Sequence, residues 1–429
     1  MYLTRLALTN FRNYAHLELA LAPGVTVLQG DNACGKTSLL EAIFYLATAR
    51  SPHAGAEREL IRWGASAEPI PFARVETQVE RGNGARTQIE IVLVQAEEKQ
   101  NQGDGARKPN GRVSKRIKVN GVGKRAIDLL GELNAVLFLP EDLDLVFGSP
   151  GHRRRYLDTT LAQIDPRYGR ALSKYDKVVE QRNSLLREFR ERAYNPHALD
   201  IWDRQLIEEG TYIVARRADA VERYNHLVAE MHARLTDRRE QLRLVYQPSV
   251  AFDLAAPPDA RRAEIARNFA RQLETLRPRE LGAAMTLVGP HRDDIRFLVT
   301  RNPSTVPFDS AQGAAQGAAA MDATTYASRG QGRTIALSFK LAEVALMRAE
   351  TGEDPVLLLD DVMSELDAAR RGALAQAVLD APQAIVTATD LDDFAAEFLE
   401  RAQVLRVCEG NVSAATEEEF SRKNPVHLG

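Results

Sequence analysis

Hydrophobic and polar positions divide the chain into strand-like and helix-like segments. Short β-strands are predicted in four regions: 3–8, 16–21, 25–29 and 72–95. A Pro23-Gly24 turn precedes the third of them. From Lys36 onward the apolar residues fall at helical spacing, which predicts a helix with one buried face. The first 100 residues therefore predict an α/β domain with its first helix beginning near Lys36.

The middle of the chain has a different pattern. Residues 150–280 are mainly helical and strongly charged, with frequent arginines. The α/β pattern resumes in four segments: a helix at about 332–350, a strand at 356–359, a helix from about 367 and a strand at 384–387. We therefore predict one α/β domain in two parts, 1–149 and 281–429, with an inserted helical lobe at 150–280.

Three shorter segments have their own signatures. Residues 97–113 are polar and lack periodicity, which predicts a mobile loop, and the low-complexity residues 302–323 predict disorder. Asn120-Gly121 suits a type I′ turn, so a hairpin is expected around it.

Composition restricts the class of protein. The 429 residues are 44% hydrophobic and 27% charged, as in ordinary globular proteins, and carry a net charge of −3. Any contact with nucleic acid must therefore use a local basic patch. Two cysteines, Cys34 and Cys408, provide no disulfide framework or metal cluster and suggest a reducing compartment. No apolar run approaches the length of a membrane span and no signal peptide is recognisable, so a cytoplasmic protein is expected.

The strongest chemical signal is a phosphate-binding loop. Residues 30–37 fit G-x-x-x-x-G-K-[ST], and the match follows a strand and opens an amphipathic helix, the context that this loop requires. Its backbone N–H groups would cradle phosphate, Lys36 would reach the β- and γ-phosphates, and the Thr37 hydroxyl would hold Mg²⁺. The candidate ATP ligands here are Gly30, Asp31, Asn32, Ala33, Cys34, Gly35, Lys36, Thr37 and Ser38.

An apolar strand that ends in two carboxylates provides the second signal. Residues 356–359 are continuously apolar, as in a central parallel strand, and Asp360 and Asp361 follow directly. The carboxyl ends of such strands face the ligand crevice of an open α/β sheet. We expect Asp360 to bind Mg²⁺ and Asp361 to orient or deprotonate an attacking water, which makes Lys36, Asp360 and Asp361 the candidate catalytic residues.

A second anion site is predicted where the helix at 332–350 begins. Ser328, Gly330 and Gln331 stand at this start, where a serine and a glycine can present hydroxyl and N–H groups to phosphate. Taken alone, the motif favours an ordinary helix cap. Because one phosphate loop suffices for a nucleotide bound within one chain, a second site 290 residues later suggests a nucleotide held by another chain.

Together these motifs resemble the ABC and SMC ATPases. Residues 328–331 are similar to the ABC signature, residues 364–367 to the D-loop, and residues 8–14 to the start of SMC-like heads. Three further segments narrow the resemblance to the RecF family of bacterial recombinational repair proteins: 139–158, 289–294 and 326–334. The resemblance runs from residue 1 to about 393, the two low-complexity loops excepted.

The resemblance implies a P-loop ATPase head of the ABC/SMC type with an inserted, mainly helical lobe. It implies ATP-dependent dimerisation, sequence-independent binding to duplex and gapped DNA, and slow hydrolysis that releases DNA. It also implies work with the RecR and RecO proteins in repair and replication restart, and adds Asp367 of the D-loop to the nucleotide ligands. Four positions depart from the common patterns. Ala33 and Arg329 remove no expected ligand, whereas Glu141 and Thr389 leave the γ-phosphate sensor unassigned.

Other interpretations remain open at this stage. The ATPase subunit of an ABC transporter would share the phosphate loop, signature and D-loop, but not the helical insertion or the RecF-like segments. A full SMC protein needs a much longer middle block, and a small-molecule kinase leaves the signature unexplained.

Two features of the middle block are also left open. Its arginines are candidates for DNA contact, although interleaved acids such as Glu180, Glu188 and Glu191 favour ordinary pairing for any one of them. His291, Arg292 and Asp293 suit either a structural network or a regulatory site.

Overall fold

The chain forms two compact units in the computed structural model. The model describes all residues except 68–69, 96–112, 191–194, 302–319 and 415–429. Residues 1–140 and 347–429 make the first unit, here called the head unit, and residues 141–346 make the second, the middle unit. Helix α9 (Arg329–Thr351) begins in the middle unit and ends in the head unit.

The head unit contains an antiparallel sheet with the strand order β2-β1-β4-β5-β6-β7. Strand β5 alternates buried and more exposed residues, because one face of the sheet covers the core. Asn120 and Gly121 both have positive φ angles in the turn between the last two strands, so the expected hairpin is confirmed. The strands are β1 (Tyr2–Phe11), β2 (Tyr14–Ala20), β4 (Phe72–Glu80), β5 (Arg86–Gln95), β6 (Val113–Val119) and β7 (Val122–Lys124).

A second six-stranded sheet in the head unit has the order β15-β14-β3-β13-β12-β8. All neighbouring pairs are parallel except β14 and β15, and β12 and β13 are buried along their whole length. This burial explains the continuous apolar run at 356–359. The strands are β3 (Gly24–Gln29), β8 (Ala135–Phe138), β12 (Val356–Asp360), β13 (Gln383–Ala388), β14 (Ala402–Cys408) and β15 (Asn411–Ala414).

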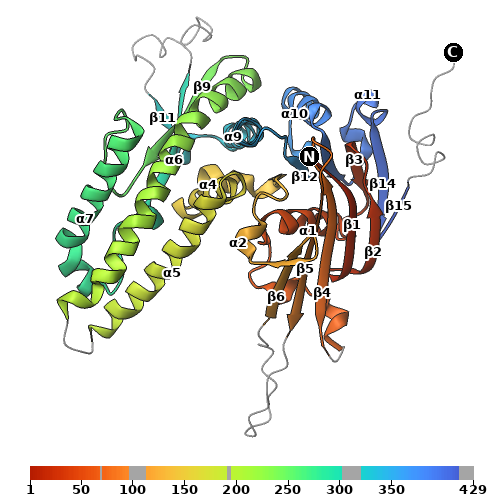
Figure 1. Ribbon diagram of the computed structural model, residues 1–429. Helices are drawn as coiled ribbons and strands as arrows, with labels where there is room; N and C mark the ends of the chain where they lie inside the picture. Colours follow the sequence, from red (N-terminus) through yellow and green to blue (C-terminus); the bar gives the residue numbers. More distant parts are fainter. Residues whose placement is uncertain (68–69, 96–112, 191–194, 302–319, 415–429) are drawn as a thin grey trace, which may run out of the picture. The chain divides into compact units, whose positions relative to one another are not determined.

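Helix α1 (Lys36–Thr48) lies between the two sheets and contacts both (Figure 1). Ten of its 13 residues are buried, which explains why its sequence is apolar on more than one side. Helix α10 (Ala368–Asp380) packs on β3 and β13, and α11 (Ala396–Leu399) packs on β14. The remaining short elements are η1 (Glu57–Leu60), η2 (Trp63–Ala67), α2 (Ala126–Leu129), η3 (Pro140–Asp142), η7 (Met363–Glu365) and η8 (Leu391–Asp393).

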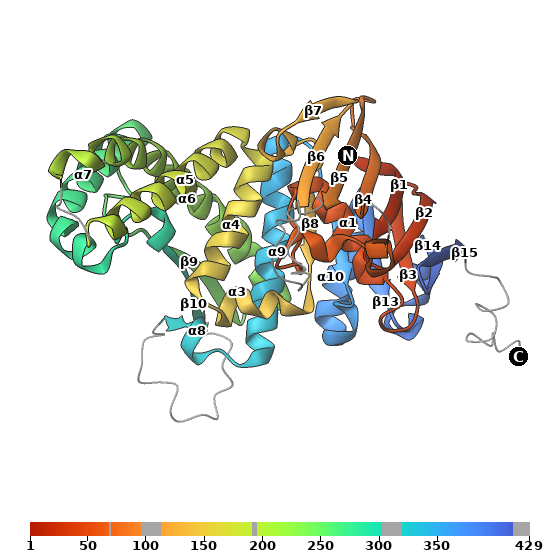
Figure 2. The ribbon, with the colours of Figure 1, turned by 90° about the horizontal axis from the view of Figure 1, so that it is seen from below.

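The middle unit is built on long helices with a small antiparallel sheet. Helix α6 packs against both α5 and α7, and the three run side by side (Figures 1 and 2). The sheet has the order β11-β10-β9. Its helices are α3 (Leu143–Phe147), α4 (Pro150–Ile164), α5 (Pro166–Glu188), η4 (Pro196–Leu199), α6 (Asp200–Leu235), α7 (Pro258–Ala283), η5 (Pro290–Arg292) and α8 (Ala323–Tyr326). Its strands are β9 (Glu240–Gln247), β10 (Asp294–Arg301) and β11 (Met321–Asp322).

The units divide the chain after 140 and 346, whereas the sequence predicts boundaries after 149 and 280. Residues 281–346 join the middle unit because β10 pairs with β9 along eight residues. This long-range pairing has no signal in the sequence next to it. Most of the predicted mobile loop at 97–113 and of the predicted disorder at 302–323 lies outside the described residues. Where these segments are described the prediction is wrong, because Val113 begins β6 and residues 321–323 belong to β11 and α8. None of the helices that the structure describes is long and apolar enough to cross a membrane.

Candidate nucleotide-binding site

The phosphate loop joins β3 to α1 in the head unit, as the sequence predicts. Gly35 has φ 115°, and a Cβ atom there would lie 2.4 Å from Asn13 Nδ2. A Cβ atom on Gly30 would lie 2.3 Å from the carbonyl oxygen of Val407. Both positions therefore require glycine, one for its backbone conformation and both for space.

The turn between β1 and β2 supports this loop from outside. Asn13 Nδ2 donates to the Cys34 carbonyl at 3.0 Å, and the Tyr14 hydroxyl donates to the Gly35 carbonyl at 3.0 Å. The Gly410 N–H donates to the same Cys34 carbonyl at 3.3 Å. These contacts fix the carbonyl groups of Cys34 and Gly35, and with them the backbone of the loop. Cys34 itself is a buried free cysteine.

Lys36 folds back into its own loop. Its ammonium donates to the Gly30 carbonyl at 2.5 Å and to the Asp31 carbonyl at 2.9 Å, and the side chain is buried. A buried cation enclosed by a glycine-rich turn is an anion site, since phosphate oxygens would attract it more strongly than these two carbonyls do.

Thr37 and Asp360 meet at the carboxyl end of the parallel sheet, although 323 positions separate them. The Thr37 hydroxyl lies 3.0 and 2.8 Å from the two carboxylate oxygens of Asp360. Thr387 of β13 also donates to Asp360, at 2.8 Å. The structure therefore places the two predicted Mg²⁺ ligands beside each other and adds Thr387, which the sequence analysis missed.

Asp361 follows Asp360 but has a different environment. Its backbone is left-handed, with φ 50°, and its N–H donates to Thr387 Oγ1 at 2.9 Å. Burial raises the pKa of its carboxyl group, Lys36 lowers it, and the charge of Asp360 raises it further. The net upward shift brings the group toward the pKa that suits a general base.

The loop and the two aspartates line one cavity of about 1830 Å³. The sequence analysis missed several of its lining residues, which come from the β1–β2 turn and from η1 and η2. Trp63 is 93% exposed, which is unusual for a tryptophan in a folded chain. Its only signal in the sequence is an isolated aromatic before a glycine. The missed residues include Arg12, Asn13, Arg58, Glu59, Arg62 and Trp63.

The signature segment lies in the middle unit, at the start of α9. The Ser328 hydroxyl oxygen accepts from the Gln331 N–H at 3.2 Å, and the Gln331 side-chain oxygen accepts from the Ser328 N–H at 3.0 Å. This reciprocal pair is a capping box. Ser328 and Gly330 are exposed. Asp367 of the D-loop caps α10 through the N–H of Arg370 at 3.0 Å and also forms an ion pair with that arginine.

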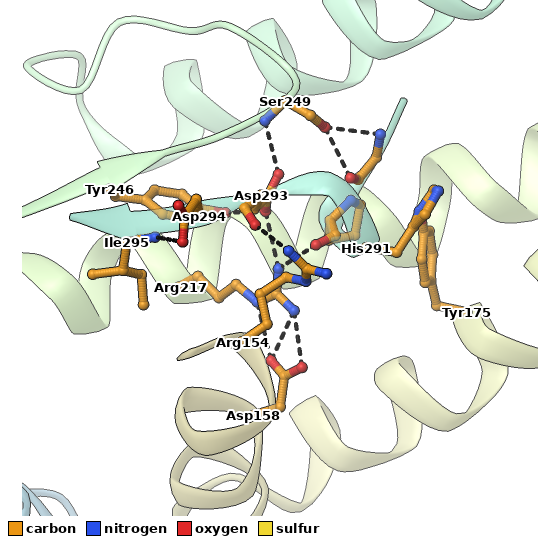
Figure 3. Close-up of polar contacts among 12 residues, drawn as sticks. Arg154, Asp158, Tyr175, Arg217, Tyr246, Ser249, His291, Asp293, Asp294 and Ile295 are labelled. Carbon is orange, nitrogen blue, oxygen red and sulfur yellow. Dashed lines mark hydrogen bonds and ion pairs between the residues drawn. The ribbon is translucent and has the colours of Figure 1, made fainter. Parts of the chain in front are cut away.

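The segment around His291 forms a buried network within the middle unit (Figure 3). Asp293 accepts hydrogen bonds from Arg217 at 3.0 Å, from Tyr246, and from the Ser249 N–H at 2.8 Å. Arg217 also makes a bidentate pair with Asp158. Of the two alternatives, the contacts of Asp293, and of His291 with Tyr175, support the structural network, whereas Arg292 is exposed and donates to the Thr286 carbonyl.

Several arginines of the predicted lobe are paired. Arg182 bonds to Asp203 and Glu280, and Arg216 forms an ion pair with Asp165. The expectation of pairing holds for these side chains, but they are buried or nearly so instead of forming a solvated helix face.

Comparisons with known proteins agree with the architecture. The model of the RecF/RecN/SMC N terminal domain family matches residues 2–409. The DNA replication and repair protein RecF of Roseiflexus castenholzii is 45% identical over 423 residues, covering 97% of this chain and all of that protein. RecF of Chloroflexus aurantiacus is 43% identical over 422 residues, covering 96% of this chain and all of that protein.

Solved structures give the same result. A structure of the recombination mediator protein RecF with ATPrS, from the RecFOR pathway, has a TM-score of 0.79 and 30% identity, covering 97% of this chain and 98% of that one. An Smc head bound to the C-winged helix domain of ScpA has a TM-score of 0.50 at 16% identity, covering 98% of this chain and all of that one, and indicates the fold alone. The chain therefore has the α/β fold of RecF and SMC ATPase heads and belongs to the RecF family of DNA replication and repair proteins.

Proposed function

We propose that this protein is an ATP-dependent DNA-binding protein that dimerises on ATP and acts in recombinational repair and replication restart at gapped DNA. Weak, DNA-dependent ATP hydrolysis then releases the DNA. The observation that carries the proposal is the convergence of Lys36, Thr37, Asp360 and Asp361 on one cavity. Solved RecF structures with ATP and with ATPrS support ATP as the ligand.

In the head unit, the triphosphate would lie along the loop of residues 30–37. Lys36 would exchange its bonds to the Gly30 and Asp31 carbonyls for the β- and γ-phosphates. Trp63 offers an open ring face in the same cavity, on which the adenine base can stack.

A Mg²⁺ ion fits the hydroxyl and carboxylate oxygens of Thr37 and Asp360, since this cation prefers oxygen ligands. Among the described residues no group of three or more His, Cys, Asp or Glu side chains could hold a metal. The ion would therefore complete its coordination with water and phosphate oxygens, and would neutralise charge on the phosphates. Thr387 keeps the Asp360 carboxylate oriented toward Thr37.

Asp361 would orient and deprotonate the attacking water. It lines the cavity, and the rise in its pKa makes it a better proton acceptor than an ordinary aspartate. Hydrolysis removes the γ-phosphate, so the protein contacts that this phosphate bridges would be lost.

The second contact to the γ-phosphate would come from another copy of the chain. Ser328 and Gly330 are exposed at the N-terminal end of the 23-residue helix α9, where the Gly330 N–H precedes the first intrahelical bond, which the Gly332 N–H makes to the Ser328 carbonyl. Two chains would thus enclose two ATP molecules in a two-fold, isologous dimer. Asp367 of the D-loop would lie at the same interface.

The DNA contact we propose is with the phosphate backbone and independent of sequence, so affinity should fall steeply with salt. RecR and RecO are the proposed protein partners, because the RecF neighbours are described within the RecFOR pathway. No observation favours a transporter ATPase, and identity of 45% to a RecF protein over 97% of this chain argues against it.

The test is sedimentation velocity of the protein with labelled duplex or gapped DNA, without nucleotide, with ADP and with ATP. ATP alone should double the protein mass and bring DNA into the complex. Lys36→Ala should abolish both effects. A wild-type protein that stays monomeric and leaves DNA free in all three conditions would refute the proposed dimer and DNA binding.

A further inference from the structure

The orientation of the signature segment depends on residues outside it. Gln331 uses both ends of its side-chain amide: the oxygen accepts from the Ser328 N–H at 3.0 Å, and the nitrogen donates to Glu240 Oε1 at 2.7 Å. A flipped amide would set its nitrogen against the Ser328 N–H and its oxygen against the carboxylate, and would lose both bonds. Glu240 therefore selects the one orientation that completes the capping box.

Glu240 is itself held in place by a buried histidine. Its other carboxylate oxygen lies 3.3 Å from His232 Nε2, and His232 Nδ1 lies 3.0 Å from Ser338 Oγ. Ser338 donates to the Thr334 carbonyl at 2.6 Å. His232 and Ser338 have no exposed surface.

These contacts form a closed circuit between three elements of the middle unit. His232 lies near the end of α6, and Glu240 is the first residue of β9. Gln331 and Ser338 are two turns apart, so they share one face of α9. The circuit thus fixes the first two turns of α9 against α6 and β9. The His232 and Gln331 hydrogen bonds both lower the pKa of the Glu240 carboxyl group, although burial raises it, so the carboxylate is charged at neutral pH.

The capping box leaves one group of the signature free for a ligand. Ser328 Oγ accepts from the Gln331 N–H, so its own O–H proton can point outward. Directly after it come the N–H groups of Arg329 and Gly330, which precede the Gln331 N–H of the capping box and the first intrahelical bond, from the Gly332 N–H to the Ser328 carbonyl. A hydroxyl donor and backbone donors on one exposed turn match the oxygens of a terminal phosphate.

We propose that Glu240 and His232 are positioning residues for the signature segment: they hold Gln331 so that Ser328 and Gly330 are preformed for the γ-phosphate of a nucleotide bound to a second copy of the chain. The inference rests on the proposed function and adds two residues to it. Preformed donors gain affinity because no side-chain freedom is lost on binding.

The test separates nucleotide binding by the head unit from closure of the dimer. Glu240→Ala should bind a fluorescent ATP analogue within twofold of wild type when dilute, because the phosphate loop belongs to the other unit. It should weaken ATP-dependent dimerisation, measured by sedimentation equilibrium, about tenfold or more, the effect of losing a hydrogen bond to a charged group. Glu240→Gln should restore most of the dimerisation, because a glutamine oxygen can still accept from Gln331.

Glu230→Ala is the matched control, because it removes an exposed glutamate of α6 whose ion pair is with Arg234, one turn along the same helix. It should behave as wild type. If Glu240→Ala is folded and dimerises with ATP as tightly as wild type, the positioning role is wrong while the proposed function stands. If Glu240→Gln is as defective as Glu240→Ala, the amide contact is not what matters and the inference fails. A wild-type protein that never dimerises with ATP overturns the proposed function, and this inference with it.

Discussion

Acidification should destabilise the middle unit through His291. The imidazole Nε2 lies 3.1 Å from the carbonyl oxygen of Thr286, which can only accept, so Nε2 carries the proton. Nδ1 lies 2.7 Å from the Tyr175 hydroxyl and therefore accepts from it (Figure 3). A second ring proton would face the hydroxyl that now donates to Nδ1. Burial lowers the pKa of His291 to about 4, helped by nearby arginines and opposed by the Thr286 bond.

The sign and size of the effect follow from this shift. Because the pKa is lower in the folded chain than its ordinary value of 6.5, the unfolded chain takes up the proton first as the pH falls. The stabilisation is thus fully present above about pH 6.5 and is lost as the pH falls through about 4. A shift of about 2.5 pKa units corresponds to at most about 3.4 kcal/mol, and partial exposure of the ring reduces the expectation to about 2 kcal/mol.

Urea unfolding at several pH values between about 7 and 4 measures this contribution of His291 to the free energy of unfolding. Trp202 lies on α6 of the middle unit, so its fluorescence in a Trp63→Phe background reports that unit. The free energy of unfolding of His291→Gln should depend less on pH than that of wild type, by about 2 kcal/mol over this interval. His226→Gln, which changes an exposed histidine of α6, is the control. Equal pH dependence of wild type and His291→Gln would refute the buried neutral imidazole.

Three substitutions test other parts of the structure. Arg217→Leu leaves the Asp158 and Asp293 carboxylates without their buried cation. It should lower the free energy of unfolding of the middle unit by about 3–5 kcal/mol. A loss below about 1 kcal/mol in urea titrations would contradict this. Asp361→Asn should bind ATP normally but slow single-turnover hydrolysis by about 100-fold or more; undiminished hydrolysis would remove Asp361 from the mechanism. Trp63→Ala should weaken binding of a fluorescent ATP analogue about three- to tenfold, whereas Trp63→Phe retains a stacking ring; if alanine and phenylalanine bind equally well, the base does not stack on this residue.

Features that depend on neighbouring residues could be predicted from the sequence. The phosphate loop, the Asn120-Gly121 hairpin and the apolar strand ending at Asp360 each follow from turn chemistry and periodicity within a few positions. The order of these signals also predicted an α/β fold. It placed Thr37 and Asp360 in one site, and the structure brings them within hydrogen-bonding distance. Their roles as metal ligands remain predictions.

Contacts between residues that are distant in the sequence could be seen only in the folded chain. Residues 281–346 belong to the middle unit because β10 pairs with β9, and Arg217 is a buried tether because Asp158 and Asp293 come to it from other elements. From the sequence alone, each of these charged residues cannot be distinguished from a charged residue on a solvated surface. Likewise, nothing near Trp63 shows that it lines the same cavity as Lys36. Turn and helix preferences act over a few residues, whereas burial and charge pairing depend on where the folded chain brings its segments together.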